Sequence, residues 1–276
     1  MDRLPAASFN ARVFAPPLAG LVLIVVHVSM HVMTNVYDEA STVGLRVAAA
    51  SHCLLSLIVL LALTASLYGF YVSTKFASRH VGYSAATVLF LGPTFVLFVY
   101  AVLLIVPQAL YLANSHVIVS NAPQYSNSSA CLRLLTPAAM NSQSANNTDP
   151  NTDTSCVTRS DAWILIVEFT LDLCQVYAQT SFLIHAQQLV PVLNVVLTQK
   201  QYQAFKGCLL LLMVFNFYWW IRVSFLAHGQ SPYGVCLFRT YYRPDSWTLV
   251  VSVTVPIIAF YRFQSFVTFL MWSLKF

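Results

Sequence analysis

Long apolar runs alternate with shorter polar segments along the whole chain. Windows of roughly 20 apolar residues, the length that crosses a bilayer as a helix, recur six times. The predicted spans lie at about 14–36, 48–71, 84–113, 161–187, 206–226 and 246–274. The pattern therefore predicts an all-α, polytopic membrane protein in which residues 1–276 form a single six-helix transmembrane domain, with the first span acting as a signal anchor.

Composition narrows the class of protein. Hydrophobic residues make up 58% of the chain and charged residues only 8%, whereas a soluble domain has about 25% charged residues. The net charge of +5 is spread thinly, and no basic cluster indicates nucleic-acid binding. The sequence lacks a Gly-rich phosphate loop, His-Glu-x-x-His, Gly-x-Ser-x-Gly and Cys-x-x-Cys. We therefore expect no enzymatic activity, no cofactor and no metal.

The loops predict how the chain is threaded through the membrane. With the N-terminus in the cytoplasm, seven Lys and Arg residues fall in inner segments and five in outer segments. The positive-inside rule favours this orientation by a small margin. Because the number of predicted spans is even, both termini are then cytoplasmic.

The loop at 115–160 supports the same orientation. It contains two N-glycosylation sequons, at Asn127 and Asn146. It also contains Cys131 and Cys156, which can close a disulfide in an oxidising space, and a cysteine in the last outer loop is an alternative partner for either. Together these features predict an extracellular, glycosylated loop and a location in the plasma membrane.

The fourth predicted span carries an unusual set of polar residues: Glu168, Asp172, Gln175 and Gln179. At about 100° per residue they fall within roughly 60° of one another on a helix. One acid inside hydrocarbon costs about 2.5 kcal/mol or more, so this polar stripe is expected to face protein or water. Intramembrane ionisable groups occur in proton relays and ion paths, which makes the stripe the candidate proton path. The alternative is a structural role in holding helices together.

Two residues outside the fourth span are further candidates for the path. Counting about 1.5 Å per residue from the outer helix ends places Arg262, in the sixth span, level with Gln175 and Gln179. Arg262 can therefore be the counter-charge of Asp172, or it can snorkel to the inner headgroups. Asn216, in the fifth span, is expected to hydrogen-bond between helices.

Histidines form a second candidate feature. His27 and His31 lie one turn apart in the first predicted span, and His52 begins the second. Because histidine changes charge between pH 5 and 8, this group can act as an external pH sensor or a weak zinc site. The alternative is a set of interfacial histidines with satisfied ring nitrogens.

The last three predicted spans, residues 162–274, carry three motifs in order: Gln179-Thr180-Ser181-Phe182-Leu183, then Asn216 with Trp219-Trp220, then Trp247, Pro256 and Phe260-Tyr261-Arg262. In this order and spacing they resemble the C-terminal half of the otopetrin proton channels. The first motif is similar to that family's Gln-Thr-x-Phe-Ile segment. The fifth span, with Asn216 followed by Trp219 and Trp220, is similar to its Asn-and-Trp helix. The sixth resembles its Trp…Pro…Phe-Tyr-Arg ending through Trp247, Pro256 and Phe260-Tyr261-Arg262.

The resemblance implies a proton-selective channel of the plasma membrane that external acid opens. Otopetrins have twelve spans in two related halves, so two copies of this chain, or association with a longer otopetrin-like chain, would supply that architecture. The implied partners are protons, membrane lipid with sterol as one option, and a second copy in a dimer. The family has His two residues after its Tyr-Arg, where this chain has Gln264, which cannot exchange a proton near neutral pH. Gln264 is included among the path candidates because it occupies the position of that histidine.

Two other functions are alternatives. The chain could be a non-conducting membrane subunit that modulates a full-length channel, which the single half and Gln264 favour. It could also be an unrelated receptor or transporter with a polar intramembrane site. Six spans with two cytoplasmic termini disfavour a seven-helix receptor, and a transporter is expected to show repeats with broken helices.

Overall fold

A computed structural model of the chain describes residues 11–36, 42–76, 85–113, 159–189, 197–226, 238, 241–242 and 244–275. Six long helices and no strand occur among these residues. They are α1 (Ala11–Val36), α2 (Thr42–Phe76), α3 (Ala85–Ala113), α6 (Arg159–Leu189), α8 (Gln199–Ile221), which a π-helical turn η2 (Arg222–Leu226) extends, and α10 (Pro244–Lys275). The predicted all-α fold is confirmed, and each predicted span corresponds to one helix.

The helix bounds differ most from the prediction at the start of α8. This helix begins at Gln199 rather than near residue 206. The backbone N–H of Thr198 donates a hydrogen bond of 3.3 Å to Oε1 of Gln201, which satisfies a donor at the helix start. The first two turns are polar, so hydropathy alone does not detect them.

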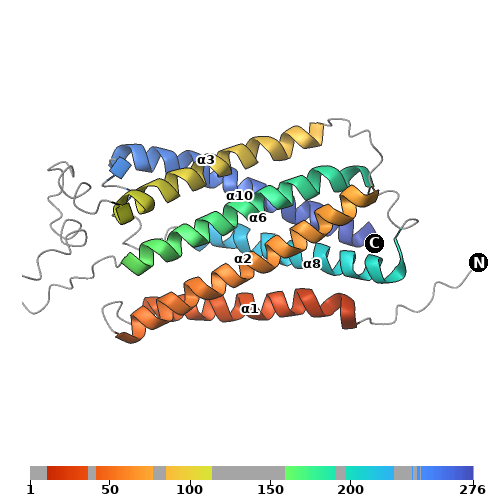
Figure 1. Cartoon of the computed structure of the whole chain (residues 1–276), viewed down its shortest axis with the longest axis horizontal. Helices are drawn as coiled ribbons and strands as arrows, with labels where there is room; N and C mark the ends of the chain where they lie inside the picture. Colours follow the sequence, from red (N-terminus) through yellow and green to blue (C-terminus); the bar gives the residue numbers. More distant parts are fainter. Residues whose placement is uncertain are drawn as a thin grey trace, which may run out of the picture.

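Five of the six helices are long and apolar enough to cross a membrane: α1, α2, α3, α8 and α10, with apolar stretches of 21 to 31 residues. Helix α6 has 31 residues but does not meet that criterion, because its acids and amides lower its hydropathy. It packs between α2 and α3, with its polar stripe turned toward the other helices (Figure 1). The chain is therefore a multi-pass helical membrane protein, and length and composition support five of the six predicted spans.

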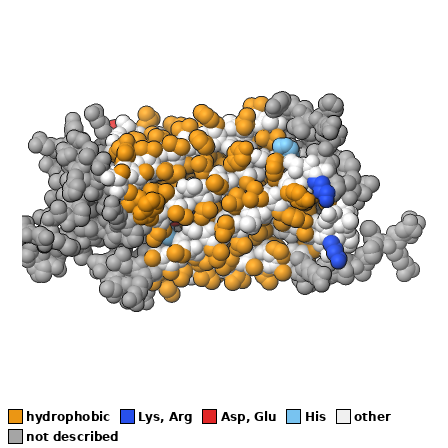
Figure 2. Space-filling model, in the orientation of Figure 1, with side chains coloured by type: hydrophobic (Ala, Val, Ile, Leu, Met, Phe, Trp, Pro, Cys, Tyr) orange, Lys and Arg blue, Asp and Glu red, His pale blue; other side chains and the backbone are white. Residues whose placement is uncertain are grey.

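The helices run alternately up and down, so α1 begins and α10 ends at the same end of the bundle (Figure 1). The four lysines of the chain, Lys75, Lys200, Lys206 and Lys275, lie in the turns at this end. In Figure 2 basic side chains gather there, while apolar side chains cover the middle of the visible face. We call it the lysine end; the prediction that it faces the cytoplasm follows from the positive-inside rule.

Candidate functional site

The polar stripe of α6 lies in the interior of the bundle. Gln175 and Gln179 are fully buried, Glu168 is 5% exposed, and the Asp172 side chain is one-quarter exposed. Residues on other faces of α6, such as Trp163 and Tyr177, are exposed instead. The expectation that the stripe faces protein is confirmed.

Arg262 of α10 pairs with the middle of this stripe. Its Nη2 donates to Oδ1 of Asp172 at 2.7 Å, and its Nη1 donates to Oε1 of Gln175 at 2.8 Å. The guanidinium also lies 5.4 Å from the ring centre of Phe215 and 5.3 Å from that of Trp219. Arg262 is 1% exposed, so it does not snorkel to the headgroups; it is the counter-charge that the sequence suggested.

Amides continue the hydrogen bonds toward the lysine end. Nε2 of Gln175 donates to Oε1 of Gln179 at 2.6 Å. Gln179 and Asn216 of α8 then bond reciprocally, at 3.0 and 2.9 Å. Gln179 also donates to the hydroxyl of Tyr261 at 3.3 Å, and that hydroxyl lies 2.8 Å from Oγ1 of Thr180. Helices α6, α8 and α10 are therefore joined by one buried polar network.

A second polar cluster surrounds Glu168, nearer the other end of the bundle. Oε2 of Glu168 lies 2.7 Å from Nδ1 of His52 on α2. Its Oε1 lies 3.7 Å from Nη2 of Arg222 in η2. The Arg222 guanidinium also lies over the Trp219 ring, 4.6 Å from its centre. From its place near the outer end of the fifth predicted span, Arg222 is expected to snorkel to the headgroups; the structure instead makes it the second basic partner of the stripe.

The histidines divide between this cluster and a neighbouring one. His27 of α1 is buried, with Nδ1 2.6 Å from the hydroxyl of Tyr218 and Nε2 3.4 Å from Oγ of Ser51. The half-buried ring of His31 stacks on His27 at 6.4 Å. Within the described residues no group of three or more His, Cys, Asp or Glu side chains is placed to hold a metal ion. The described residues therefore give no support to the zinc alternative. Of the three histidines, His52 contacts the stripe directly, through Glu168.

Trp219 lies between the two clusters. Its ring is flanked by both guanidiniums, Arg222 at 4.6 Å and Arg262 at 5.3 Å. Three buried donors around it have no hydrogen-bond partner among the described residues: Nε1 of Trp219, Nη1 of Arg222 and Nε of Arg262. Buried donors of this kind are commonly satisfied by internal water. The site thus combines two acids, two arginines and three unsatisfied donors around one tryptophan ring.

The remaining candidates lie elsewhere. Gln264 is half-buried, and in the described part of the chain its side chain is outside the hydrogen-bonded network. Asn127, Asn146, Cys131 and Cys156 lie outside the described residues.

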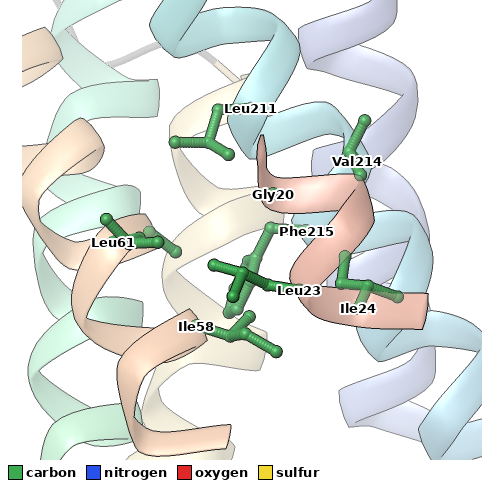
Figure 3. Close-up of a pocket in the computed structure, with 9 residues that line it drawn as sticks. Gly20, Leu23, Ile24, Ile58, Leu61, Leu211, Val214 and Phe215 are labelled. Carbon is green, nitrogen blue, oxygen red and sulfur yellow. The ribbon is translucent and has the colours of Figure 1, made fainter. Parts of the chain in front are cut away.

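An apolar recess between α1, α2 and α8 is separate from the polar groups (Figure 3). It is lined by Gly20, Leu23, Ile24, Ile58, Leu61, Ala62, Leu211, Val214 and Phe215. No polar side chain lines it, so it offers no aqueous route to the network.

Sequence reasoning missed Tyr218, Tyr261, Thr180 and Arg222 as members of the site. Tyr261 directly precedes Arg262, and Thr180 directly follows Gln179. Their position beside two predicted site residues could have identified them. Nothing in the sequence pairs Tyr218 with His27, because the two lie 191 positions apart.

No family model, no curated protein and no solved structure matches this chain. The fold and the site alone define its class, a multi-pass helical membrane protein with a charged, hydrogen-bonded centre.

Proposed function

We propose that this chain forms a proton-selective ion channel of the otopetrin type in the plasma membrane, opened by external acid. The observation that carries the proposal is the series of polar groups along α6 and its neighbours. Its titratable members are His52, Glu168 and Asp172. Hydrogen bonds continue from Asp172 and Arg262 through Gln175 to Gln179, whose amides can order water along the path. Helices whose buried faces carry such groups mark proton relays in membrane proteins.

Selectivity would follow from the packing of the network. A hydrated metal ion needs a water-filled path or a ring of oxygen ligands that replaces its water. The buried amides bond to one another at 2.6 to 3.0 Å and leave no such ring. A proton needs only a relay of titratable side chains and hydrogen-bonded water. Internal water at the unsatisfied groups around Trp219 would complete that relay.

The acids and the histidine have distinct proposed roles. His52, one-third exposed, exchanges a proton with the outer solution and passes it to Glu168. Asp172 is the next acid along the stripe, one turn further, and its carboxylate accepts a hydrogen bond from Arg262. Proton movement past Trp219 then depends on water at the unsatisfied donors.

Assembly is part of the proposal. The chain acts as a dimer, or it associates with a longer otopetrin-like chain, and its lipid-facing apolar surface contacts membrane lipid. The second candidate function is a non-conducting subunit. It is favoured by the full set of hydrogen bonds on Gln175, Gln179 and Asn216, which would hold a bundle together equally well.

Proton flux through the purified chain tests the proposal. The chain is reconstituted into liposomes that contain a pH-sensitive dye, and external pH is lowered while a potassium gradient with valinomycin sets the potential. We expect internal acidification with the wild type and at least a tenfold slower rate for Asp172→Asn and Glu168→Gln. Thr170→Val, on the exposed face of the same helix, is the matched control and should match the wild type.

A correctly folded wild type without flux would overturn the autonomous channel. Co-expression with a full-length channel then tests the subunit function, because a subunit should alter that channel's current or surface amount.

A further inference from the structure

The polar network stops well short of the lysine end. From Glu168 to Gln179 the stripe rises about 16 Å along α6, roughly half of a hydrocarbon core of about 30 Å. The turns that follow bury aromatic rings instead. We call the cluster of Phe182, Phe205, Phe269 and Trp272 the aromatic plug.

Phe182 is the centre of this plug. It follows Gln179 by one turn on α6 and is fully buried. Its ring stacks on Phe269 at 5.8 Å, meets Phe205 edge-on at 5.8 Å and lies 6.1 Å from Trp272. Residues from α6, α8 and α10 therefore close the bundle interior at one level.

Helix α2 completes the closure through Gly69. A Cβ atom built on Gly69 would lie 2.7 Å from the tip of the Phe182 ring. The ring thus touches the α2 backbone itself, and only glycine leaves room for it.

Two buried hydroxyls flank the plug along the membrane axis. Ser265 lies one turn before Phe269 on α10, and Ser73 lies one turn after Gly69 on α2. Both helices run toward the lysine end, so the two serines are on opposite sides of Phe182. Each is fully buried. Oγ of Ser73 has no hydrogen-bond partner among the described residues, and Ser265 lies beside the Tyr261 hydroxyl of the polar network.

We propose that Phe182, wedged against Gly69 and stacked on Phe269, is the gate that closes the lysine-end half of the proton path. The proposal rests on the proposed function. Apolar constrictions block conduction by excluding water, and a small ring movement re-wets them. Displacing Phe182 would join Ser265 to Ser73 and would complete a hydrated route between the polar network and the lysine end.

Sided thiol labelling tests the gate without requiring conduction. Ser265→Cys is placed in the wild-type, Phe182→Ala and Phe238→Ala backgrounds, and a small membrane-impermeant methanethiosulfonate is added at the lysine end. Lys275→Cys, at the exposed end of α10, confirms which vesicles present that end. Phe238 is an equally buried phenylalanine outside the plug, so its substitution controls for lost packing. Labelling is read by mass spectrometry of the peptide that contains position 265.

We expect labelling at least tenfold faster with Phe182→Ala than with either other background. Equal rates in all three backgrounds, fast or absent, would overturn the gate, because Phe182 would then not be the barrier. Equal acceleration by Phe238→Ala would also overturn it, since general loosening would explain the access.

Proton flux on the same variants separates the two proposals. If both hold, Phe182→Ala raises flux at neutral external pH several-fold above the wild type, and Phe238→Ala does not. Labelling as expected without flux in any variant would retain the barrier and reject the channel. Flux in the wild type that Phe182→Ala leaves unchanged would retain the channel and reject the gate.

Discussion

Asp172 and Arg262 form an ion pair of 2.7 Å that joins α6 to α10 across 90 positions of sequence. The two side chains differ in environment, because the arginine is 1% exposed and the aspartate one-quarter exposed. Burying a guanidinium requires a partner, and removing one partner of a buried pair typically costs about 3–5 kcal/mol. Asp172 therefore stabilises the fold even if it also carries protons.

The first prediction separates these two roles with a double-mutant cycle. Asp172→Asn should lower the free energy of unfolding by about 3 kcal/mol, the lower end of that range because the acid is partly solvated. Arg262→Gln together with Asp172→Asn should recover at least half of the loss, because no uncompensated charge remains. Proton flux should stay at least tenfold low in both variants. Thermal unfolding in detergent gives the stability, and flux that returns with stability would assign the pair a structural role only.

The second prediction concerns the reciprocal bonds between Gln179 and Asn216. Asn216→Leu should cost about 1–3 kcal/mol, because it leaves the buried Gln179 amide unsatisfied. Gln179→Leu with Asn216→Leu removes both polar groups but also the acceptor of Gln175 Nε2, so it should recover only part of the lost stability. If the amides order the water that carries protons, the double variant remains without flux although it folds. A stable double variant that conducts normally would remove them from the path.

The polar stripe of α6 could be predicted from the sequence because helix periodicity depends only on neighbouring residues. The stripe of α6 follows from residues 168 to 179 alone, and Arg262 could be set against it because both helices cross the same thickness of membrane. Of the two alternatives for Arg262, the structure shows the pairing with Asp172, and it adds Gln175 as a second partner.

Helix neighbours and rotations could not be predicted. The sequence does not say that α2 packs along α6, so the bond between His52 and Glu168 was missed. Arg222 lies close enough to a helix end to reach the headgroups, and the π-helical turn that starts at this residue has no sequence signal. These contacts depend on packing between elements that are more than 50 positions apart.

The third prediction assigns the acid response to His52. Its ring nitrogen lies 2.7 Å from Oε2 of Glu168, and histidine is the side-chain type that can gain a charge near physiological pH. His52→Gln keeps a hydrogen-bond donor for Glu168 but cannot gain a charge. Flux through this variant should depend on external pH at least threefold less steeply between pH 5 and 7. His185→Gln is the control, because His185 bonds a carbonyl of its own helix outside the network; an equal effect of both would exclude a specific sensor.

The fourth prediction tests the threading of the chain. If the loop at 115–160 is extracellular, Asn127 and Asn146 carry glycans that an endoglycosidase removes. Each single Asn→Gln variant should lose one step of electrophoretic mobility shift, and the double variant should lose both. An epitope tag at either terminus should stain only after the plasma membrane is permeabilised. Staining of intact cells by either tag would contradict the predicted orientation.

The fifth prediction concerns Gly69 and requires no channel activity. Gly69→Ala places a methyl group 2.7 Å from the Phe182 ring, which Phe269 and Trp272 hold from the other side. Overpacking of this kind costs about 1–3 kcal/mol, and the higher helix propensity of alanine offsets about 1 kcal/mol of it. We expect a net lower melting temperature in detergent.

Two other helical glycines provide the matched controls for Gly69→Ala. Gly92→Ala meets nothing within 4 Å, so it should be neutral or stabilising. Gly20→Ala meets Leu211 at 2.6 Å beside the apolar recess, far from the plug in sequence, and it should destabilise without changing access to position 265. If Gly69→Ala behaves like Gly92→Ala, then Phe182 has space to retreat from α2, and its contact with the Gly69 backbone does not hold the ring in place.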